Sequence, residues 1–364
     1  MFDKILSIPF YVKLSQIVIG IIGLTYIMIV GQDIIVPLIF SLIIAILLNP
    51  VVNFLVRKRF NRIAAISLTV VFTTILILTL LYFIASQLST FSEALPQLKL
   101  KFKAMFDDGI NWMSQYFNIS TSKVEGWIET QKNEGMNNST AVIGQTVTTV
   151  SSILVLVFLL PVYIFLILFY KPLLLDFINK IFPTNKNHTV KEVLTETKTL
   201  IQSYLIGLLL ETGIVAALNA TALFIIGIEY AILIGIIGAL LNLIPYIGGI
   251  VAIAIPMVFA IATHEPIYAL YVLIAYMVVQ LLDNNFIVPK FVASKVKINA
   301  LASIVVVLIG GAIWGVSGMF LSLPLTAIFK VICDRIEPLK PIGFLIGDNM
   351  PDITFFGKEI KKKK

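Results

Sequence analysis

Apolar residues run in long, nearly uninterrupted blocks along most of the chain. A block such as Ile63–Leu88 exceeds the roughly 18 apolar residues that mark a membrane-spanning helix. The blocks lack the alternating polarity, about ten residues at a time, of outer-membrane β-barrel strands. Eight blocks are recognisable: Leu14–Val30, Ile34–Val56, Ile63–Leu88, Ala141–Tyr170, Ser203–Ile226, Tyr230–Ala262, Ile267–Val288 and Asn299–Cys333. We therefore expect an all-α polytopic membrane protein with about eight hydrophobic segments.

Two of the eight blocks are too long to be simple spans. Tyr230–Ala262 has 33 residues, which would make a straight helix of about 50 Å, whereas about 20 residues cross a bilayer. Helix-breaking residues interrupt both this block and Asn299–Cys333. In the first block they are Pro245, Gly248 and Gly249, and in the second Gly310, Gly311, Gly315, Gly318 and Pro324. We expect both segments to be broken or re-entrant, with these residues as breaks or hinges.

Each broken segment follows a conventional span, so the C-terminal half resembles a duplication. If both segments are re-entrant hairpins, they enter from opposite sides and form an inverted repeat. If both instead cross the bilayer completely, the basic loop 290–298 lies outside the cell. The sequence leaves both alternatives open.

Composition and charge narrow the class of protein. The chain is 59% hydrophobic and 13% charged, with a mean hydropathy of +0.99, which excludes an ordinary soluble enzyme. The net charge of +7 lies in short runs beside the apolar blocks, as in residues that set membrane orientation, so we expect no nucleic-acid partner. The cluster Arg57–Arg62 predicts cytoplasmic N- and C-termini, and one cysteine and two distant histidines offer no metal or cofactor site.

These patterns predict five parts of the chain. They are a three-span region (1–88), an external insert (89–140), the fourth span with a cytoplasmic amphipathic helix (141–202), a transport core (203–337) and a basic cytoplasmic tail (338–364). The insert interleaves charged and aromatic residues, which favours amphipathic helices on the membrane or on a neighbouring subunit. A solvated helical loop is the alternative.

A polar cluster ends the seventh block, and it is the main candidate for a binding site. No arrangement of nucleophile, acid and base and no nucleotide-binding loop is present, so we expect no enzymatic activity. On an α-helix Gln280, Asp283 and Asn284 would share one face, followed by Asn285 and then by Pro289. Such groups are costly in hydrocarbon unless they pair or are hydrated. They either bind a solute or cap the span in the headgroup zone.

Two further polar residues lie inside apolar blocks. Glu211 is within the fifth block, where it is either a proton carrier or part of an interhelical hydrogen bond, and Asn242 precedes the break at Pro245. Between Thr199 and Pro289 there is no lysine or arginine. A site in this region would favour a monovalent cation or a neutral polyol over an anion.

Three stretches resemble signatures of the autoinducer-2 exporter (AI-2E) family of bacterial transporters: Asn242–Gly249, Asp283–Pro289 and Gly310–Pro324. The similarity extends over nearly the whole chain, although the family motif commonly ends in proline where this chain has Gly249. The resemblance implies a multi-pass permease of the bacterial cytoplasmic membrane, homo-oligomers, and export of the quorum-sensing signal autoinducer-2 or, in some members, sodium/proton antiport.

We therefore expect a secondary transporter for a small neutral solute such as autoinducer-2, with its site between the two broken segments. Asp283, Asn284, Asn285, Gln280, Asn242 and Glu211 are the candidate ligands. The alternatives are a Na⁺/H⁺ antiporter and, from another class, a channel or membrane scaffold.

Overall fold

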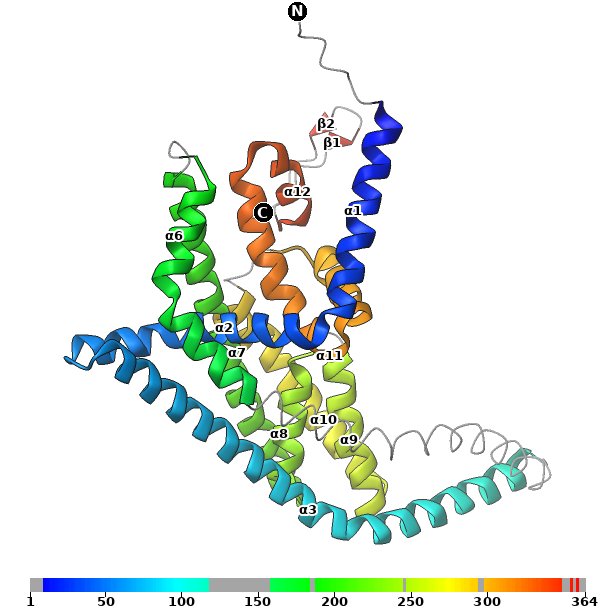
Figure 1. The fold of residues 1–364 in the computed structure, drawn as a ribbon. Helices are drawn as coiled ribbons and strands as arrows, with labels where there is room; N and C mark the ends of the chain where they lie inside the picture. Colours follow the sequence, from blue (N-terminus) through cyan, green and yellow to red (C-terminus); the bar gives the residue numbers. More distant parts are fainter. Residues whose placement is uncertain are drawn as a thin grey trace, which may run out of the picture. The chain divides into compact units, whose positions relative to one another are not determined.

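The computed structural model describes residues 9–117, 158–183, 187–244, 247–293 and 298–348, together with two short strands near the C-terminus. The strands, β1 (Thr354–Phe355) and β2 (Lys358–Glu359), pair antiparallel. All other regular structure in the described ranges is helical (Figure 1). The predicted all-α class is confirmed.

The helices are labelled in chain order in Figure 1. They are α1 (Phe10–Val30), α2 (Gln32–Arg57), α3 (Arg62–Phe117), α6 (Lys171–Ile181), α7 (Asn187–Ile226), α8 (Ala231–Asn242), α9 (Ile247–Thr263), α10 (Ile267–Leu282), the π-helical turns η2 (Asp283–Ile287) and η3 (Pro289–Ala293), α11 (Ala300–Arg335), the 3₁₀ turn η4 (Glu337–Leu339) and α12 (Lys340–Ile346). A further helix, Phe158–Phe169, precedes α6.

In the described part of the chain, six helices are long and apolar enough to cross a membrane. The number is seven if Phe158–Phe169 and Lys171–Ile181, which meet at a bend of 63°, form one span. The large apolar side chains of α1 are all exposed or half-exposed in the isolated chain, as expected of a helix that faces lipid. The chain is therefore a multi-pass membrane protein.

Two elements continue beyond the ends of their apolar blocks. α3 does not end near Leu88 but runs on to Phe117, and α7 joins the predicted amphipathic helix Val190–Ile201 to the fifth span in one helix of 40 residues. A helix can continue from the bilayer into water, because charged residues at helical spacing make its surface polar without interrupting its backbone. Residues 118–140 of the predicted insert and the first part of the fourth block lie outside the described residues.

The chain divides into two compact units, each built from separated segments. The first unit contains residues 1–39, 174–207 and 289–364, and the second contains residues 40–173 and 208–288. The second unit has a buried core that joins the end of α7 to α8, α9 and α10. A second buried cluster in this unit joins α2, α3 and Phe158–Phe169.

The first long apolar block folds into a hairpin in the second unit. Ala231 and Ile234, near the start of α8, belong to the same buried cluster as Phe259 and Ala262 near the end of α9. The rings of Tyr230 and Phe259 also meet edge to face, with centroids 5.9 Å apart. Because the two ends of the block are adjacent, α8 and α9 are antiparallel arms and not one long span.

The second long apolar block also reverses direction, in the first unit. Within α11 the backbone breaks at Trp314 (φ −131°, ψ 17°) and Gly315 (φ 59°, ψ −140°), and a side chain at the positive φ of Gly315 would be strained. A methyl group on Gly318 would lie 1.9 Å from the carbonyl oxygen of Gly310, although eight residues of straight helix rise about 12 Å. Both predicted breaks are therefore present.

A contact at the base of the α11 hairpin bears on the basic loop. Ile298 forms a bridge with Gly347, and the Asn299 side chain donates hydrogen bonds to the carbonyl oxygens of Leu345 and Gly347 at 2.7 and 3.0 Å. A methyl group on Gly347 would also lie 3.2 Å from Cε of Lys330 in the returning arm of α11, so the start of α11 is close to its end. This favours the hairpin alternative over a complete crossing. The inverted repeat itself stays a prediction.

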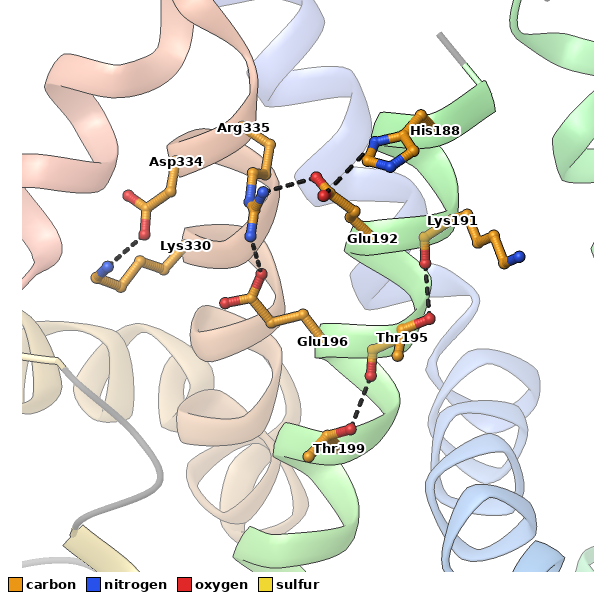
Figure 2. Close-up of polar contacts among 9 residues, drawn as sticks. All are labelled: His188, Lys191, Glu192, Thr195, Glu196, Thr199, Lys330, Asp334 and Arg335. Carbon is orange, nitrogen blue, oxygen red and sulfur yellow. Dashed lines mark hydrogen bonds and ion pairs between the residues drawn. The ribbon is translucent and has the colours of Figure 1, made fainter.

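An ion-pair cluster fixes the end of α11 to α7 within the first unit (Figure 2). The guanidinium of Arg335 donates to Glu192 at 2.7 Å and to Glu196 at 2.9 Å, so one planar group bridges two acids one helical turn apart. His188 lies 3.5 Å from Glu192 on the same helix. These side chains are more than a third exposed, so the cluster is solvated.

Candidate functional site

The candidate site forms where the C-terminal end of α10 meets the tip of the α8–α9 hairpin in the second unit. Asp283 is 1% exposed, and its Oδ2 accepts a hydrogen bond from Nδ2 of Asn242 at 3.1 Å. Its other carboxylate oxygen, Oδ1, is buried without a hydrogen-bond partner in the described part of the chain. A buried carboxylate with one unpaired oxygen needs a further partner, such as water, a proton or a ligand.

The backbone around Asp283 is π-helical. The turn η2 (Asp283–Ile287) follows α10 directly, and η3 begins at Pro289. π-helical turns insert an extra residue and are frequent at functional sites. Pro289 lacks a backbone N–H and so cannot continue an α-helical hydrogen-bond ladder. The polar sequence at Asp283 therefore lies on irregular backbone, although the side chains of Gln280 and Asn284 still meet across one turn.

Two glycines of α9 allow the tip of the α8–α9 hairpin to approach the amide side chains of Asn242 and Gln280. A methyl group on Gly248 would lie 1.8 Å from the carbonyl oxygen of Leu241, so only glycine permits this contact between the arms. A methyl group on Gly249 would lie 3.5 Å from both Asn242 Oδ1 and Gln280 Oε1. Gly249 therefore faces the space between two amide side chains. We call Asn242, Gln280 and Asp283 the polar cluster.

Glu211 extends this cluster towards α7. Its side chain is 7% exposed, and its carboxylate is close enough to Asp283 for the two charges to interact. Two buried carboxylates in one unit repel each other unless a proton or a cation lies between them. The structure thus brings Asn242, Gln280 and Asp283 together from α8, α10 and η2, and it places Glu211 of α7 within electrostatic range of Asp283.

The other predicted residues take different positions. Asn284 is exposed and accepts a hydrogen bond from Nε2 of Gln280 at 3.1 Å, whereas Asn285 is exposed and donates to the carbonyl oxygen of Leu281 at 2.8 Å. Asn285 therefore stabilises the irregular backbone instead of lining the cluster. Pro245 lies outside the described residues.

The predicted breaks of the second block belong to the first unit. Gly310 and Gly318 pack against each other, and Gly311 packs against Met319, with Gly315 at the reversal and Pro324 buried in the returning arm. They shape the α11 hairpin and hold no polar ligand. A site between the two broken segments stays a prediction.

Sequence reasoning missed Tyr276, which lies beside Asn219 close to the cluster. Tyr276 is 4% exposed and Asn219 is 2% exposed, and the Tyr276 hydroxyl and Asn219 Oδ1 are buried without a partner among the described residues. Both side chains face Gly238, where a methyl group would lie 3.3 Å from the Tyr276 hydroxyl and 3.5 Å from Asn219 Nδ2. The signal was present, since Tyr276 precedes Gln280 by four residues and Asp283 by seven.

This arrangement offers amide and carboxylate oxygens but few donors. It suits a ligand that donates hydrogen bonds or carries a single positive charge. In the described residues no group of three histidine, cysteine, aspartate or glutamate side chains is placed to hold a metal ion. Hydrogen bonding and charge are therefore the chemistry that the cluster provides.

Comparisons with known proteins agree with this architecture. The family model described as "AI-2E family transporter" matches residues 16–337. The AI-2 transport protein TqsA of Escherichia coli (strain K12) is 26% identical over 344 residues, covering 93% of this chain and 95% of that protein. The protein YueF of Bacillus subtilis (strain 168) is 25% identical over 307 residues, covering 81% and 82% respectively. The protein YhhT of E. coli (strain K12) is 25% identical over 345 residues, covering 93% and 94%. Because the family model spans nearly all of the helical segments, the chain belongs to the AI-2E family of transporters.

Proposed function

We propose that the protein is a secondary transporter that exports a small, neutral, hydroxylated solute, and that the polar cluster binds this solute. The observation that supports the proposal is the pairing of Asp283 with Asn242 at a break in a helical hairpin. Interrupted helices with polar groups at their breaks are the usual place for a transporter's binding site. The unpaired Oδ1 of Asp283 would accept a hydrogen bond from a solute hydroxyl.

Autoinducer-2 is the solute that we propose. The name of TqsA refers to AI-2 transport, and that protein covers nearly the whole of this chain. The absence of lysine and arginine between Thr199 and Pro289 supports a substrate without negative charge. In this proposal the protein releases a quorum-sensing signal from the cell.

Monovalent cation/proton antiport is the second candidate. It is favoured by the two buried carboxylates of Glu211 and Asp283, which interact electrostatically. Such a pair would hold either a proton or a monovalent cation, which is the exchange that antiport needs. A channel or a scaffold is the alternative of another class, and saturable flux coupled to a gradient would exclude both.

The cellular setting follows from the same proposal. Residues Arg57, Lys58, Arg59 and Arg62 lie at the turn between α2 and α3. By the charge rule this turn, and with it both termini, lies in the cytoplasm of a bacterial inner membrane. We also propose a homo-oligomer in the lipid bilayer.

Flux in proteoliposomes tests the proposal. Purified wild type, Asp283→Asn and Asp33→Asn are compared for efflux of autoinducer-2 and for Na⁺-driven proton movement. Asp283→Asn keeps the shape and removes the charge, so solute efflux should fall by up to about tenfold. Asp33→Asn, which changes an exposed acid at the start of α2, is the matched control and should leave flux unchanged.

The two assays separate the two candidate functions. Autoinducer-2 efflux above that of empty liposomes supports signal export. Na⁺-dependent proton flux alone, abolished by Asp283→Asn, would instead assign antiport. Absence of both fluxes in the wild-type protein would contradict the proposed function.

A further inference from the structure

A second polar cavity lies in the second unit, at the far end of α10 from the polar cluster. It has a volume of about 640 Å³ and lies between α3 and the connection from α9 to α10. Its polar lining consists of Lys101, Asp108, Thr263, His264, Glu265 and Tyr268. Tyr268 is in the first turn of α10 and Asp283 follows its last residue, so about 22 Å of helix separates the cavity from the polar cluster.

The hydrogen bonds around His264 define its chemistry. Thr263 Oγ1 lies 2.8 Å from the carbonyl oxygen of Phe259 and 2.8 Å from His264 Nδ1. The carbonyl can only accept, so the single hydroxyl proton of Thr263 goes to Phe259. With that proton on Phe259, Nδ1 of His264 is the donor to Thr263, and Nε2 is the ring nitrogen left for a ligand.

The remaining groups supply both acceptors and donors. Asp108 and Glu265 are exposed acids that accept hydrogen bonds, whereas Lys101 donates, its Nζ lying 3.5 Å from the carbonyl oxygen of Thr263. The rings of His264 and Tyr268 lie 4.6 Å apart at 33°, which holds both rings in place at the cavity wall. A hydroxyl group both donates and accepts hydrogen bonds, so it matches this mixed lining better than an anion, which can only accept.

We propose that this cavity is a second binding site for a small, neutral, polyhydroxylated solute. One lysine and two carboxylates give the lining a net charge of −1, which opposes an anion, and the mixture of hydrogen-bond donors and acceptors matches the hydroxyl groups of a neutral ligand. A cavity of this size is within the usual range for small-molecule sites. The proposal rests on the proposed function, since the cavity would be a second binding site, beside the extension of α3, for the same class of solute.

Binding of a neutral sugar to the full-length protein tests the proposal. D-ribose is the probe, and D-ribose 5-phosphate is its negatively charged counterpart. Saturation-transfer NMR on protein in nanodiscs would be carried out in the Asp283→Asn variant, which weakens the polar cluster and isolates the cavity. Ribose should bind. His264→Ala and Asp108→Asn, each made in this background, should raise the dissociation constant for ribose about tenfold, which corresponds to the loss of one hydrogen bond.

A matched control exists because the chain has a second histidine. His188→Ala, in the first unit, should leave ribose binding unchanged. Equal binding by the background variant with and without His264→Ala, or equal binding of the two sugars, would overturn the proposal. If the wild-type protein shows no flux but this pattern of ribose binding persists, the proposed function fails and the cavity site stands.

Discussion

At the scale of single residues, Asp283 is unusual because its buried carboxylate has too few hydrogen-bond partners to offset the cost of burial. Placing an aspartate in the middle of a membrane-spanning helix costs about 2.5–3.5 kcal/mol. Asn242 supplies one neutral hydrogen bond to Oδ2 and leaves Oδ1 unpaired among the described residues. A single amide does not offset the burial of a charge. This imbalance is why we propose that Asp283 binds the transported solute.

Glycines with a close backbone neighbour should tolerate no side chain. In Gly318→Ala the new methyl group would lie 1.9 Å from the carbonyl oxygen of Gly310, so the α11 hairpin has to open. We expect a loss of about 1–3 kcal/mol or more, seen as a lower melting temperature of the purified protein. Gly213→Ala is the matched control, because a methyl group there meets nothing within 4 Å, and it should stabilise α7 by about 0.5–1 kcal/mol. Equal melting temperatures for the two variants would contradict the close packing of Gly318.

At the scale of elements, the Arg335 cluster links the end of α11 to α7 (Figure 2). The two bonds of Arg335 are solvated, so the coupling to each glutamate should be below about 1 kcal/mol and should fall at high salt. A double-mutant cycle with Arg335→Ala and Glu192→Ala measures this coupling. Arg335→Lys should lose most of it, since an ammonium lacks the planar fork that spans both acids. A coupling that is independent of salt would show that the cluster is not solvated.

The elements also show what could be read from the sequence. Both breaks were predictable, because glycine and proline within an apolar run favour an interrupted helix. The extension of α3 to Phe117 was not predictable, since charged residues have the same spacing on a continuing helix and on a separate one. The π-helical turn at Asp283 was also not predicted, since Pro289 within an apolar run indicates that a helix is interrupted but not which irregular backbone precedes the interruption.

At the scale of the whole molecule, the orientation in the membrane can be inferred from the positions of basic residues and from the contacts around α11. Ile298, just before α11, pairs with Gly347 beyond its end, so we expect Ile298 and η4 on one side of the membrane. From the charge rule we propose that this side and the turn at Lys58 are cytoplasmic and that the extension of α3 is outside. The second cavity would then open to the exterior.

Cysteine labelling tests this orientation in intact vesicles. Cys333 is the only cysteine and is buried, so Cys333→Ser provides a background without reactive thiols. Single cysteines at the exposed positions Lys58→Cys, Asn111→Cys and Glu337→Cys are then treated with a membrane-impermeant maleimide. In right-side-out vesicles only Asn111→Cys should react, and in inside-out vesicles only Lys58→Cys and Glu337→Cys, because α3 crosses the bilayer between Lys58 and Asn111. Reaction of Lys58→Cys and Asn111→Cys from the same side would mean that α3 does not cross the bilayer. Reaction of Asn111→Cys only in inside-out vesicles would mean that the second cavity faces the cytoplasm, since Lys101 and Asp108 line it on the same part of α3.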